Sequence, residues 1–567
     1  MERNAILATA LVILILLGYQ WYLSQYEMPP QEASRPAPPV APTQSPPTQS
    51  RPEAAPPPAA KAPRARVKAA VPPRGYTPTA ELRLPAKEVV VETPLVRVTL
   101  TTMGARATSW LLKHYNQTSG SPVDLVAIHE PGAGPAPLEV WMDGRQAPDV
   151  FQVDRERLTL SGEESGTITF TYVDSAGAEI QKRLTFRGNR YRVEVAVIVR
   201  NLSSEDLAVQ TRLAWGPGLR NSADKKVSTL QPPTFWLDGK RVQEDLAKLN
   251  GEKTFDGAVS WAALQDSYFA AAVLPKEKGL RAFAMKGEQD QPIVGVMAPK
   301  QSLQPGAETA LAAEVFAGPK DLDVLKGAGQ ELDKLVDLGW FDILARPALY
   351  LVKFLYGFTG NYGIAIILVT ILQKVAFYPL TMKSLKSMQA MQSIQPKVQA
   401  LQERYKNNPQ KKQEETMALY RKHGVNPMGG CLPMLVQIPI FIALYNALSN
   451  SVEMWQAHFL WIQDLTQPDS LFKLQLWGGE HYNAGNILGL LMGVSMWVQQ
   501  KMSPPAGDPR QAQMMLWMMP ILFTWMFWSF PSGLVLYWLV NNILQIGQQW
   551  LIMGKSSRQA PAEGQAA

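Results

Sequence analysis

Five long apolar stretches near the C-terminal end constrain the fold of this chain more than any other feature. The first, Gly360 to Met382, contains a single charged residue, Lys374, and the other four contain no Asp, Glu, Lys or Arg. These four are residues 429–448, 482–500, 514–530 and 534–553. As helices, all are about long enough to cross ~30 Å of hydrocarbon, with 514–530 at the short limit. We therefore predict a helical membrane bundle.

A sixth apolar run, Ala5 to Leu23, follows a short head that contains Arg3. The residues after this run lack a small-x-small cleavage pattern, so we interpret 1–25 as an uncleaved transmembrane anchor rather than a secretory signal. Residues 26–80 include 16 prolines among Ala, Gln, Ser and Thr, a composition that cannot bury a core. We predict six spans in total, with a Pro-rich disordered linker after the first.

Residues 81–320 show short β-branched runs with alternating polarity, such as Val96 to Leu100 and Tyr191 to Val197, divided by Gly, Asp and Pro. This pattern predicts a large all-β domain, and the turn spacing favours an antiparallel sandwich. Because Cys431 is the single cysteine, no intrachain disulfide can stabilise this domain, and its own core must do so. Residues 321–358 are predicted to form a connector and an amphipathic helix along the membrane surface.

The charges of the loops predict the orientation of the spans. Residues 383–422 contain nine Lys or Arg and three Glu, whereas 451–481 contain one Lys and four acids. Positive loops stay on the cytoplasmic side, so both termini are predicted to be cytoplasmic and the β domain to lie on the external side of the membrane. The predicted segments are a span at 359–382, a cytoplasmic helical hairpin at 383–427, four spans with short loops at 428–553 and a cytoplasmic tail at 554–567.

Lys374 is the candidate centre of a functional site, because a charge inside a span is costly and faces protein or water. It lies eight or nine residues before the basic loop, ~12 Å below the cytoplasmic face. The alternative is a lysine near a helix end whose side chain reaches the interface. Polar or aromatic residues recur beside it at helical spacing: Thr370, Gln373, Phe377 and Thr381.

Two other predicted spans place glutamines at the same depth, Gln437 and Gln545, each eight residues from a cytoplasmic end. The last span carries a polar stripe that we predict to occupy one helical face. Lipid cannot satisfy such groups, so they should face one another or a water-filled space, although hydrogen bonds that merely join helices are an alternative. No Asp or Glu occurs in the five stretches to pair with Lys374. The stripe consists of Tyr537, Asn541, Gln545, Gln548 and Gln549.

Three motifs carry a family resemblance: VNPMGGCLPMLVQIPIF from Val425 to Phe441, YPLT from Tyr378 to Thr381, and FPSGLVLYW from Phe530 to Trp538. They closely resemble the YidC family of membrane protein insertases. The resemblance covers essentially the whole chain, in the Gram-negative layout of anchor, periplasmic β-sandwich and five-helix core. The motifs are long and specific.

The resemblance implies an insertase with a hydrophilic groove, open to the cytoplasm and to lipid, whose cation attracts the acidic external part of a substrate. Lys374 matches the family's groove position, which is often Arg, so a paired hydrogen bond to a carboxylate is lost here. Thr370 and Tyr537 match positions that contact the passing segment, and Gln437 matches the polar lining. The implied partners are nascent inner-membrane proteins, the Sec translocon, the ribosome and targeting factors, and membrane lipid, with no specific nucleic acid sequence.

The basic hairpin has two interpretations, a solvated charged hairpin or an adaptable Met-rich surface that captures substrates and meets the ribosome. The family resemblance favours the second. The candidate residues are Met388, Met391, Arg404, Lys411 and Lys412.

A solute or anion transporter with Lys374 as its substrate site is the alternative function, although no convincing repeat relates the spans. An enzyme in the β domain is a third possibility, but His114 and His129 show no context for a catalytic pair. The other histidines have no metal-ligand spacing, and no Walker-type glycine-rich loop occurs. We therefore predict no enzymatic activity, no metal and no cofactor.

Overall fold

The computed structural model describes residues 85–117, 120–127, 137–142, 150–219, 230–249, 251–287, 290–425, 432–475, 481–502 and 509–557. The predicted anchor (1–25) and linker (26–80) lie outside the described residues, as do His129, Cys431 and the tail from residue 558 on. Among the described residues, 394–425 form one compact unit and the remainder form a second.

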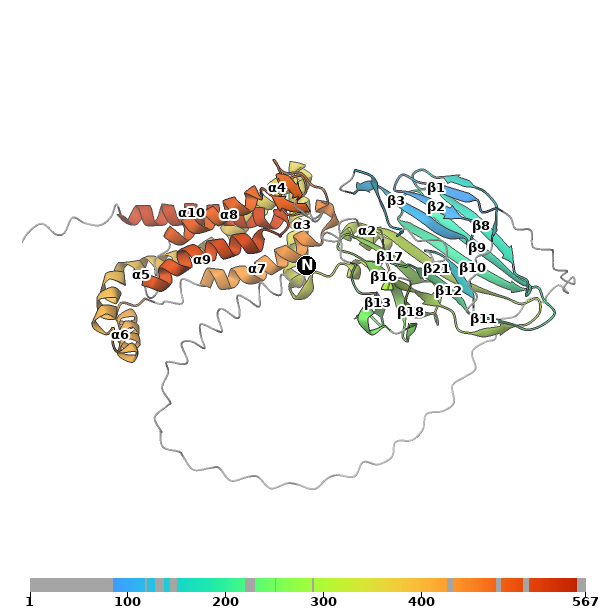
Figure 1. Ribbon diagram of the computed structural model, residues 1–567, viewed down its shortest axis with the longest axis horizontal. Coiled ribbons are helices and arrows are strands. Elements are labelled where there is room, and N and C mark those ends of the chain that lie inside the picture. Colours follow the sequence, from blue (N-terminus) through green and yellow to red (C-terminus); the bar gives the residue numbers. More distant parts are fainter. Residues whose placement is uncertain are drawn as a thin grey trace, which may run out of the picture. The chain divides into compact units, whose positions relative to one another are not determined.

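The β region is built on a nine-stranded antiparallel sheet with the strand order β14-β13-β16-β17-β21-β10-β9-β8-β6 (Figure 1). In β10 the valines at 193, 195, 197 and 199 are buried and alternate with more exposed residues, because successive side chains of a strand point to opposite faces. The strands are β6 Gln152–Val153, β8 Ser165–Val173, β9 Ala178–Arg187, β10 Arg192–Asn201, β13 Thr234–Leu237, β14 Lys240–Gln243, β16 Val259–Gln265, β17 Phe269–Pro275 and β21 Glu308–Pro319.

Two five-stranded sheets pack against this sheet, in the orders β4-β3-β2-β1-β7 and β15-β18-β19-β12-β5. Trp110 of β3 joins the layers, since its ring centroid lies 6.3 Å from that of Phe186 in β9 and 5.7 Å from that of Trp215 in β12. The strands are β1 Glu88–Glu92, β2 Val96–Thr101, β3 Arg106–Asn116, β4 Pro122–Asp124, β5 Val140–Met142, β7 Arg157–Thr159, β12 Thr211–Trp215, β15 Lys253–Phe255, β18 Arg281–Lys286 and β19 Pro292–Met297, with β11 Leu207–Val209 paired to β20 Gln301–Leu303.

The region is therefore largely β-sheet, as predicted, and its strand pairs are antiparallel except at one edge. Strand β7 pairs parallel to β1, with Val91 opposite Leu158. The chain reaches β7 only after β5 and β6 have paired in the other two sheets. A parallel neighbour needs such a long connection, which turn signals in the sequence do not reveal.

A lysine lies in the core of the β region. Lys182 of β9 has no solvent exposure, and its Nζ donates to the carbonyl oxygens of Ala105 and Leu138. Burial lowers the pKa of Lys182 to about 7, against the smaller opposing effect of Glu139. A neutral amine keeps two N–H donors, so it can satisfy both carbonyls without carrying charge.

Lys182 is expected to make the stability of the β region rise with pH. Above about pH 7 the folded lysine is neutral, whereas the unfolded lysine holds its proton up to about 10.5. The unfolded state then binds more protons, so the free energy of unfolding increases by at most about 1.4 kcal/mol per pH unit between these values and is flat below them. Urea unfolding of the full chain in detergent, read by proteolysis within the β region, should show this increase relative to Lys182→Met. Parallel pH profiles of the two proteins would contradict it.

The connector after the β region contains helix α2 (Leu322–Ala328), two short 3₁₀ helices (Leu332–Leu335 and Gly339–Phe341) and helix α3 (Asp342–Thr359). Lys353 of α3 is its charged hub, because its Nζ lies 3.2 Å from Asp321, 2.5 Å from Asp323 and 3.2 Å from Glu453. Burial opposes the charge of Lys353, but these carboxylates outweigh it and raise the lysine's pKa. The ion cluster joins the start of α2 to α3 and to the segment after α7 (Leu432–Ser449).

The helix predicted at 359–382 is instead two helices. Helix α4 (Tyr362–Ala376) ends at Phe377, and helix α5 (Tyr378–Arg404) continues at a bend of 66°. Pro379 accounts for the break, because proline lacks an N–H donor and its ring clashes with the carbonyl group four residues earlier.

Within the described residues, no individual helix is both long and apolar enough to qualify as a membrane span, but the bent pair α4 and α5 qualifies together. The six-span count remains a prediction.

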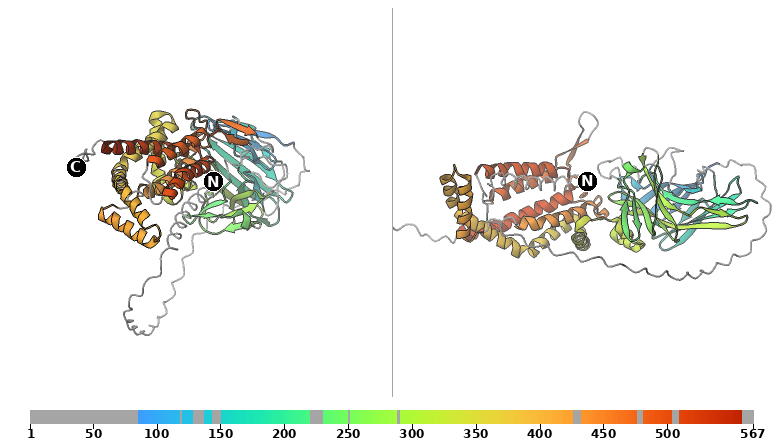
Figure 2. Two further views of the ribbon diagram at one scale, coloured as in Figure 1. Left: turned by 60° about the vertical axis from the view of Figure 1, so that its left-hand side comes forward. Right: turned by 90° about the horizontal axis from the view of Figure 1, so that it is seen from below.

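The remaining helices are α8 (Ile487–Met502), α9 (Pro509–Phe527) and α10 (Ser532–Ser557), preceded by a two-stranded hairpin of β22 (Phe472–Gln475) and β23 (His481–Ala484). Figures 1 and 2 show α7, α8, α9 and α10 running alongside one another. Helix α10 packs against α4, α7 and α8, and so reaches three of the predicted spans. It is therefore the element that brings polar residues of different helices together.

The unit at 394–425 contains the end of α5 and helix α6 (Pro409–Lys422). Asn408 caps α6, since its side chain accepts a hydrogen bond from the amide of Lys411, and Pro409 occupies the first turn where a missing N–H is tolerated. Within this unit, Lys397 Nζ lies 3.2 Å from His423 Nε2.

Candidate functional site

Three helices contribute to a closed ring of hydrogen bonds. Gln373 of α4 donates through Nε2 to Gln437 Oε1 of α7 at 3.2 Å, and Gln437 donates through Nε2 to the hydroxyl of Tyr537 in α10. The Tyr537 hydroxyl in turn donates to Gln373 Oε1 at 3.1 Å. Each side chain therefore satisfies another, and residues more than 160 positions apart in the sequence meet at one level.

Lys374 lies beside this ring and makes a different contact. Its Nζ donates to Gln545 Oε1 of α10 at 2.8 Å, and the side chain is half-buried. In the part of the chain that the structure describes, Lys374 forms no ion pair with a carboxylate. The cation is held by a neutral amide oxygen, a weaker partner than a carboxylate.

Two amide oxygens of α10, Asn541 Oδ1 and Gln548 Oε1, are buried without a hydrogen-bond partner among the described atoms. Asn541 lies between Tyr537 and Gln545 on α10. Buried polar atoms are almost always paired, so a free acceptor here suits a water or an incoming donor. We name Gln373, Lys374, Gln437, Tyr537, Asn541 and Gln545 the polar cluster.

Thr370, the remaining candidate of this site, is fully buried, and its hydroxyl donates to the carbonyl oxygen of Ile366 in its own helix at 2.7 Å. That bond leaves the hydroxyl outside the ring of Gln373, Gln437 and Tyr537.

The predicted single stripe on α10 is wrong for Gln549. Its Nε2 donates to the carbonyl oxygen of Met502 in α8 at 2.8 Å, and the nearby Asn542 donates to Ser495 Oγ at 3.2 Å. Twelve residues correspond to 3⅓ helical turns, so Gln549 is rotated by about 120° from Tyr537. We name Ser495, Asn542 and Gln549 the α8–α10 seam, which the sequence analysis missed; a serine within the apolar run 482–500 was its available signal.

The hairpin candidates lie in different environments. Met391 of α5 is buried and Met388 is half-buried. The predicted role of Met391 on a capture surface stays a prediction, and its side chain would have to become exposed to fulfil it. Arg404 and Lys411 are exposed, and Lys412 is half-buried.

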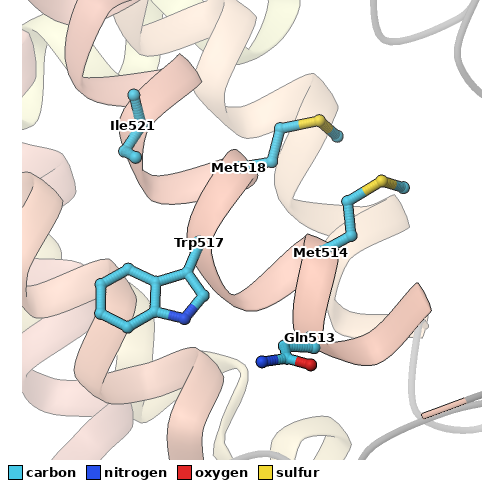
Figure 3. Close-up of a pocket in the computed structure, with 5 residues that line it drawn as sticks. All are labelled: Gln513, Met514, Trp517, Met518 and Ile521. Atoms are coloured by element: carbon cyan, nitrogen blue, oxygen red, sulfur yellow. The ribbon is translucent and has the colours of Figure 1, made fainter. Parts of the chain in front are cut away.

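An open hollow of about 500 Å³ lies on α9 (Figure 3). It is lined by Gln513, Met514, Trp517, Met518 and Ile521, none of which belongs to the polar cluster. All five side chains are exposed, and four of them are apolar. A hollow of this kind suits hydrocarbon rather than a small polar ligand.

Among the residues that the structure describes, no group of three or more His, Cys, Asp or Glu side chains could hold a metal ion. His114 is exposed on β3.

Two family models match the chain: "YidC periplasmic domain" over residues 88–351 and "60Kd inner membrane protein" over 354–559. A protein of Geobacter metallireducens named membrane protein insertase YidC is 38% identical, covering 97% of this chain and 98% of its own length. The protein of that name from Geobacter sulfurreducens is 39% identical with the same coverage. A crystal structure of an active YidC insertase is 19% identical, covers 82% of this chain and 92% of its own, and has a TM-score of 0.36.

Proposed function

Since this chain belongs to the YidC family of inner-membrane insertases, we propose that its polar cluster forms a cationic groove for the charged external part of a substrate. The substrates are nascent inner-membrane proteins, each with an apolar segment to be released into lipid. The groove opens to the cytoplasm and to lipid, so a polar segment has less hydrocarbon to cross. Electrostatic attraction and hydration draw the polar segment into the groove, and no nucleotide hydrolysis is needed.

The contact between Lys374 and Gln545 is the observation that carries this proposal. Gln545 holds the cation at 2.8 Å through a neutral amide oxygen. A substrate carboxylate can replace that oxygen, because hydrogen bonds between ionised groups are roughly twice as strong as neutral ones. When the substrate leaves, Lys374 again donates its hydrogen bond to Gln545. The ammonium group therefore always has a polar partner.

The ring of Gln373, Gln437 and Tyr537 supports a second part of the proposal. It joins α4, α7 and α10 immediately next to Lys374. We infer that the ring closes the outer end of the groove, so that charged residues pause at Lys374 while the apolar segment moves sideways. The unsatisfied oxygen of Asn541 then receives water or a substrate N–H.

The exposed face of α9 is the proposed lipid-side path. Met514, Trp517 and Ile521 line its hollow, and side chains of this kind contact acyl chains and a passing apolar helix equally well (Figure 3). The apolar part of α9, Gln513–Phe527, is short for a span, which would thin the bilayer locally.

The orientation proposed here has six spans, both termini in the cytoplasm and the β region in the periplasm. The exposed Arg404 and Lys411 then face the cytoplasm. Their charge suits contact with the ribosome and targeting factors, and the insertase works alone or beside the Sec translocon.

Reconstitution tests the proposed function and separates it from transport. The purified chain in liposomes, without an energy source, should protect a small single-span or hairpin substrate from external protease. Empty liposomes and the heat-denatured chain are the controls. Anion flux through the protein without substrate protection would support the transporter alternative, in which Lys374 is an anion site, and would overturn the insertase proposal.

A further inference from the structure

A short turn in the segment after α7 exposes two large apolar residues. Leu460 is 75% exposed and Trp461 38% exposed, and we name this pair the outer tip. Leu460 also has a positive φ of 51°, a backbone conformation that is unfavourable for leucine. An exposed leucine gains no free energy from contact with water, and it would gain by contact with an apolar environment.

The outer tip is a fixed structure. Phe459 and Ile462 exchange two backbone hydrogen bonds of 2.9 and 2.8 Å across the turn. The indole Nε1 of Trp461 donates to Asp469 Oδ2 at 3.3 Å, which orients the ring. The backbone of the turn and the orientation of the Trp461 ring are therefore fixed.

Contacts with two helices set the position of the tip. The side chain of Asn361, at the start of α4, donates to the carbonyl oxygen of His458 at 3.1 Å. Phe459 packs so closely on Gly363 that an added Cβ would lie 2.1 Å from its ring. Gly533, at the start of α10, donates its amide to Leu465 O at 2.8 Å. These contacts fix the position of the outer tip along the axes of α4 and α10, close to their first turns.

Asp464 and Asp469, two acids of this segment, have hydrogen-bond partners within the fold. Asp464 Oδ1 accepts hydrogen bonds from the amide of Gln456 and from the amide and hydroxyl of Thr466, and burial raises the pKa of Asp464 above its ordinary value. Asp469 Oδ2 accepts from the amide of Leu488 as well as from Trp461. Each carboxylate is satisfied inside the fold, so neither opposes contact of the tip with lipid.

Exposed apolar residues near the outer tip, on α3 and α4, indicate that the tip contacts lipid. The chain enters α4 from the exposed Phe354 and Phe358 of α3, and the exposed Ile364 lies one residue beyond Gly363. Exposed apolar residues thus also occur on α3 and on the first turn of α4, which Phe459 of the turn contacts at Gly363. We propose that the outer tip inserts into the boundary between headgroups and acyl chains of the periplasmic leaflet, where tryptophan is favoured, and sets the depth of α4 and α10. This rests on the proposed orientation, in which these helices begin at the periplasmic side.

Fluorescence quenching in liposomes tests the outer tip. In a Cys431→Ser background, Leu460→Cys is labelled with the environment-sensitive dye NBD and reconstituted in phosphatidylethanolamine–phosphatidylglycerol vesicles. Glu163→Cys, on an exposed turn of the β region, is the aqueous reference, and Ile364→Cys on α4 is the lipid reference. The label at 460 should emit to the blue of the label at 163. It should also be quenched by shallow doxyl lipid and be several-fold less accessible to iodide.

Iodide accessibility at 460 equal to that at 163 would overturn the proposal, and would leave a protein partner as the occupant of the tip. Labelled variants are first compared with the unlabelled chain for monodisperse elution in detergent, so a misfolded variant is not scored. The measurement uses no insertion substrate. A water-exposed tip in an active insertase would reject the tip alone, whereas a lipid-buried tip in an inactive protein would reject the proposed function alone.

Discussion

Lys374→Ala is expected to reduce the insertion of substrates with acidic external segments by about ten-fold or more, and to affect wholly apolar substrates much less. The variant removes the charge that pairs with a substrate carboxylate and leaves Gln545 without its donor. Hydrogen bonds to charged groups contribute about 1.5–3 kcal/mol, which corresponds to roughly ten-fold or more in rate. The measurement is protease protection of a matched pair of substrates that differ in one external Asp.

Two variants separate charge from other effects at Lys374. Lys374→Arg should retain most of the activity, because it keeps the cation, whereas Lys374→Met keeps the length and should behave like the alanine variant. Lys501→Ala removes one exposed positive charge from α8, outside the polar cluster, and should leave the pair of substrates unchanged. Equal loss for acidic and apolar substrates in Lys374→Ala would point to collapse of the bundle and contradict the groove.

Gln437→Leu is expected to destabilise the bundle and to weaken insertion together. The change removes both bonds that α7 makes to the ring, and strands polar groups of Gln373 and Tyr537. Leaving a buried polar group unsatisfied raises the free energy of the folded state by about 1–3 kcal/mol. Thermal unfolding in detergent should therefore show a lower Tm, and the protection assay should show slower insertion of acidic substrates.

Asn542→Leu is the matched control for Gln437→Leu. It removes a buried amide from the α8–α10 seam, where the partner is Ser495, and leaves the polar cluster intact. We expect a lower Tm with unchanged preference between acidic and apolar substrates. If Asn542→Leu abolished that preference and Gln437→Leu preserved it, the assignment of the two polar faces of α10 would be reversed.

Much of the polar cluster was predictable from depth. Lys374, Gln437 and Gln545 lie at similar distances from the predicted cytoplasmic ends, and helical rise converts residue counts into depth. Rotation about the helix axis was overlooked, because each step of four residues turns the helix by about 40° and three such steps turn it by about 120°. That is why Asn541 and Gln545 lie at the cluster while Gln549 contacts α8.

Packing between segments, which no single segment reveals, also explains the burial of Met391 and the bend at Phe377. Methionine on a basic helix fits an open surface or a buried stripe equally well, and only packing distinguishes them. Pro379 was visible in the sequence, but proline inside a predicted span can produce a tolerated kink or a full break. The observed 66° between α4 and α5 depends on what each half packs against.

The sequence by itself determined which segments are apolar, which loops are basic, that residues 81–320 favour strands, and through long motifs, the family. These properties are local, because hydropathy, charge and alternation are read within one segment. Only the tertiary structure decided the parallel strand β7, the closed ring of Gln373, Gln437 and Tyr537, the neutral partner of Lys374 and the fixed outer tip. Each depends on residues far apart in the chain reaching hydrogen-bond or packing distance, and no single segment contains that information.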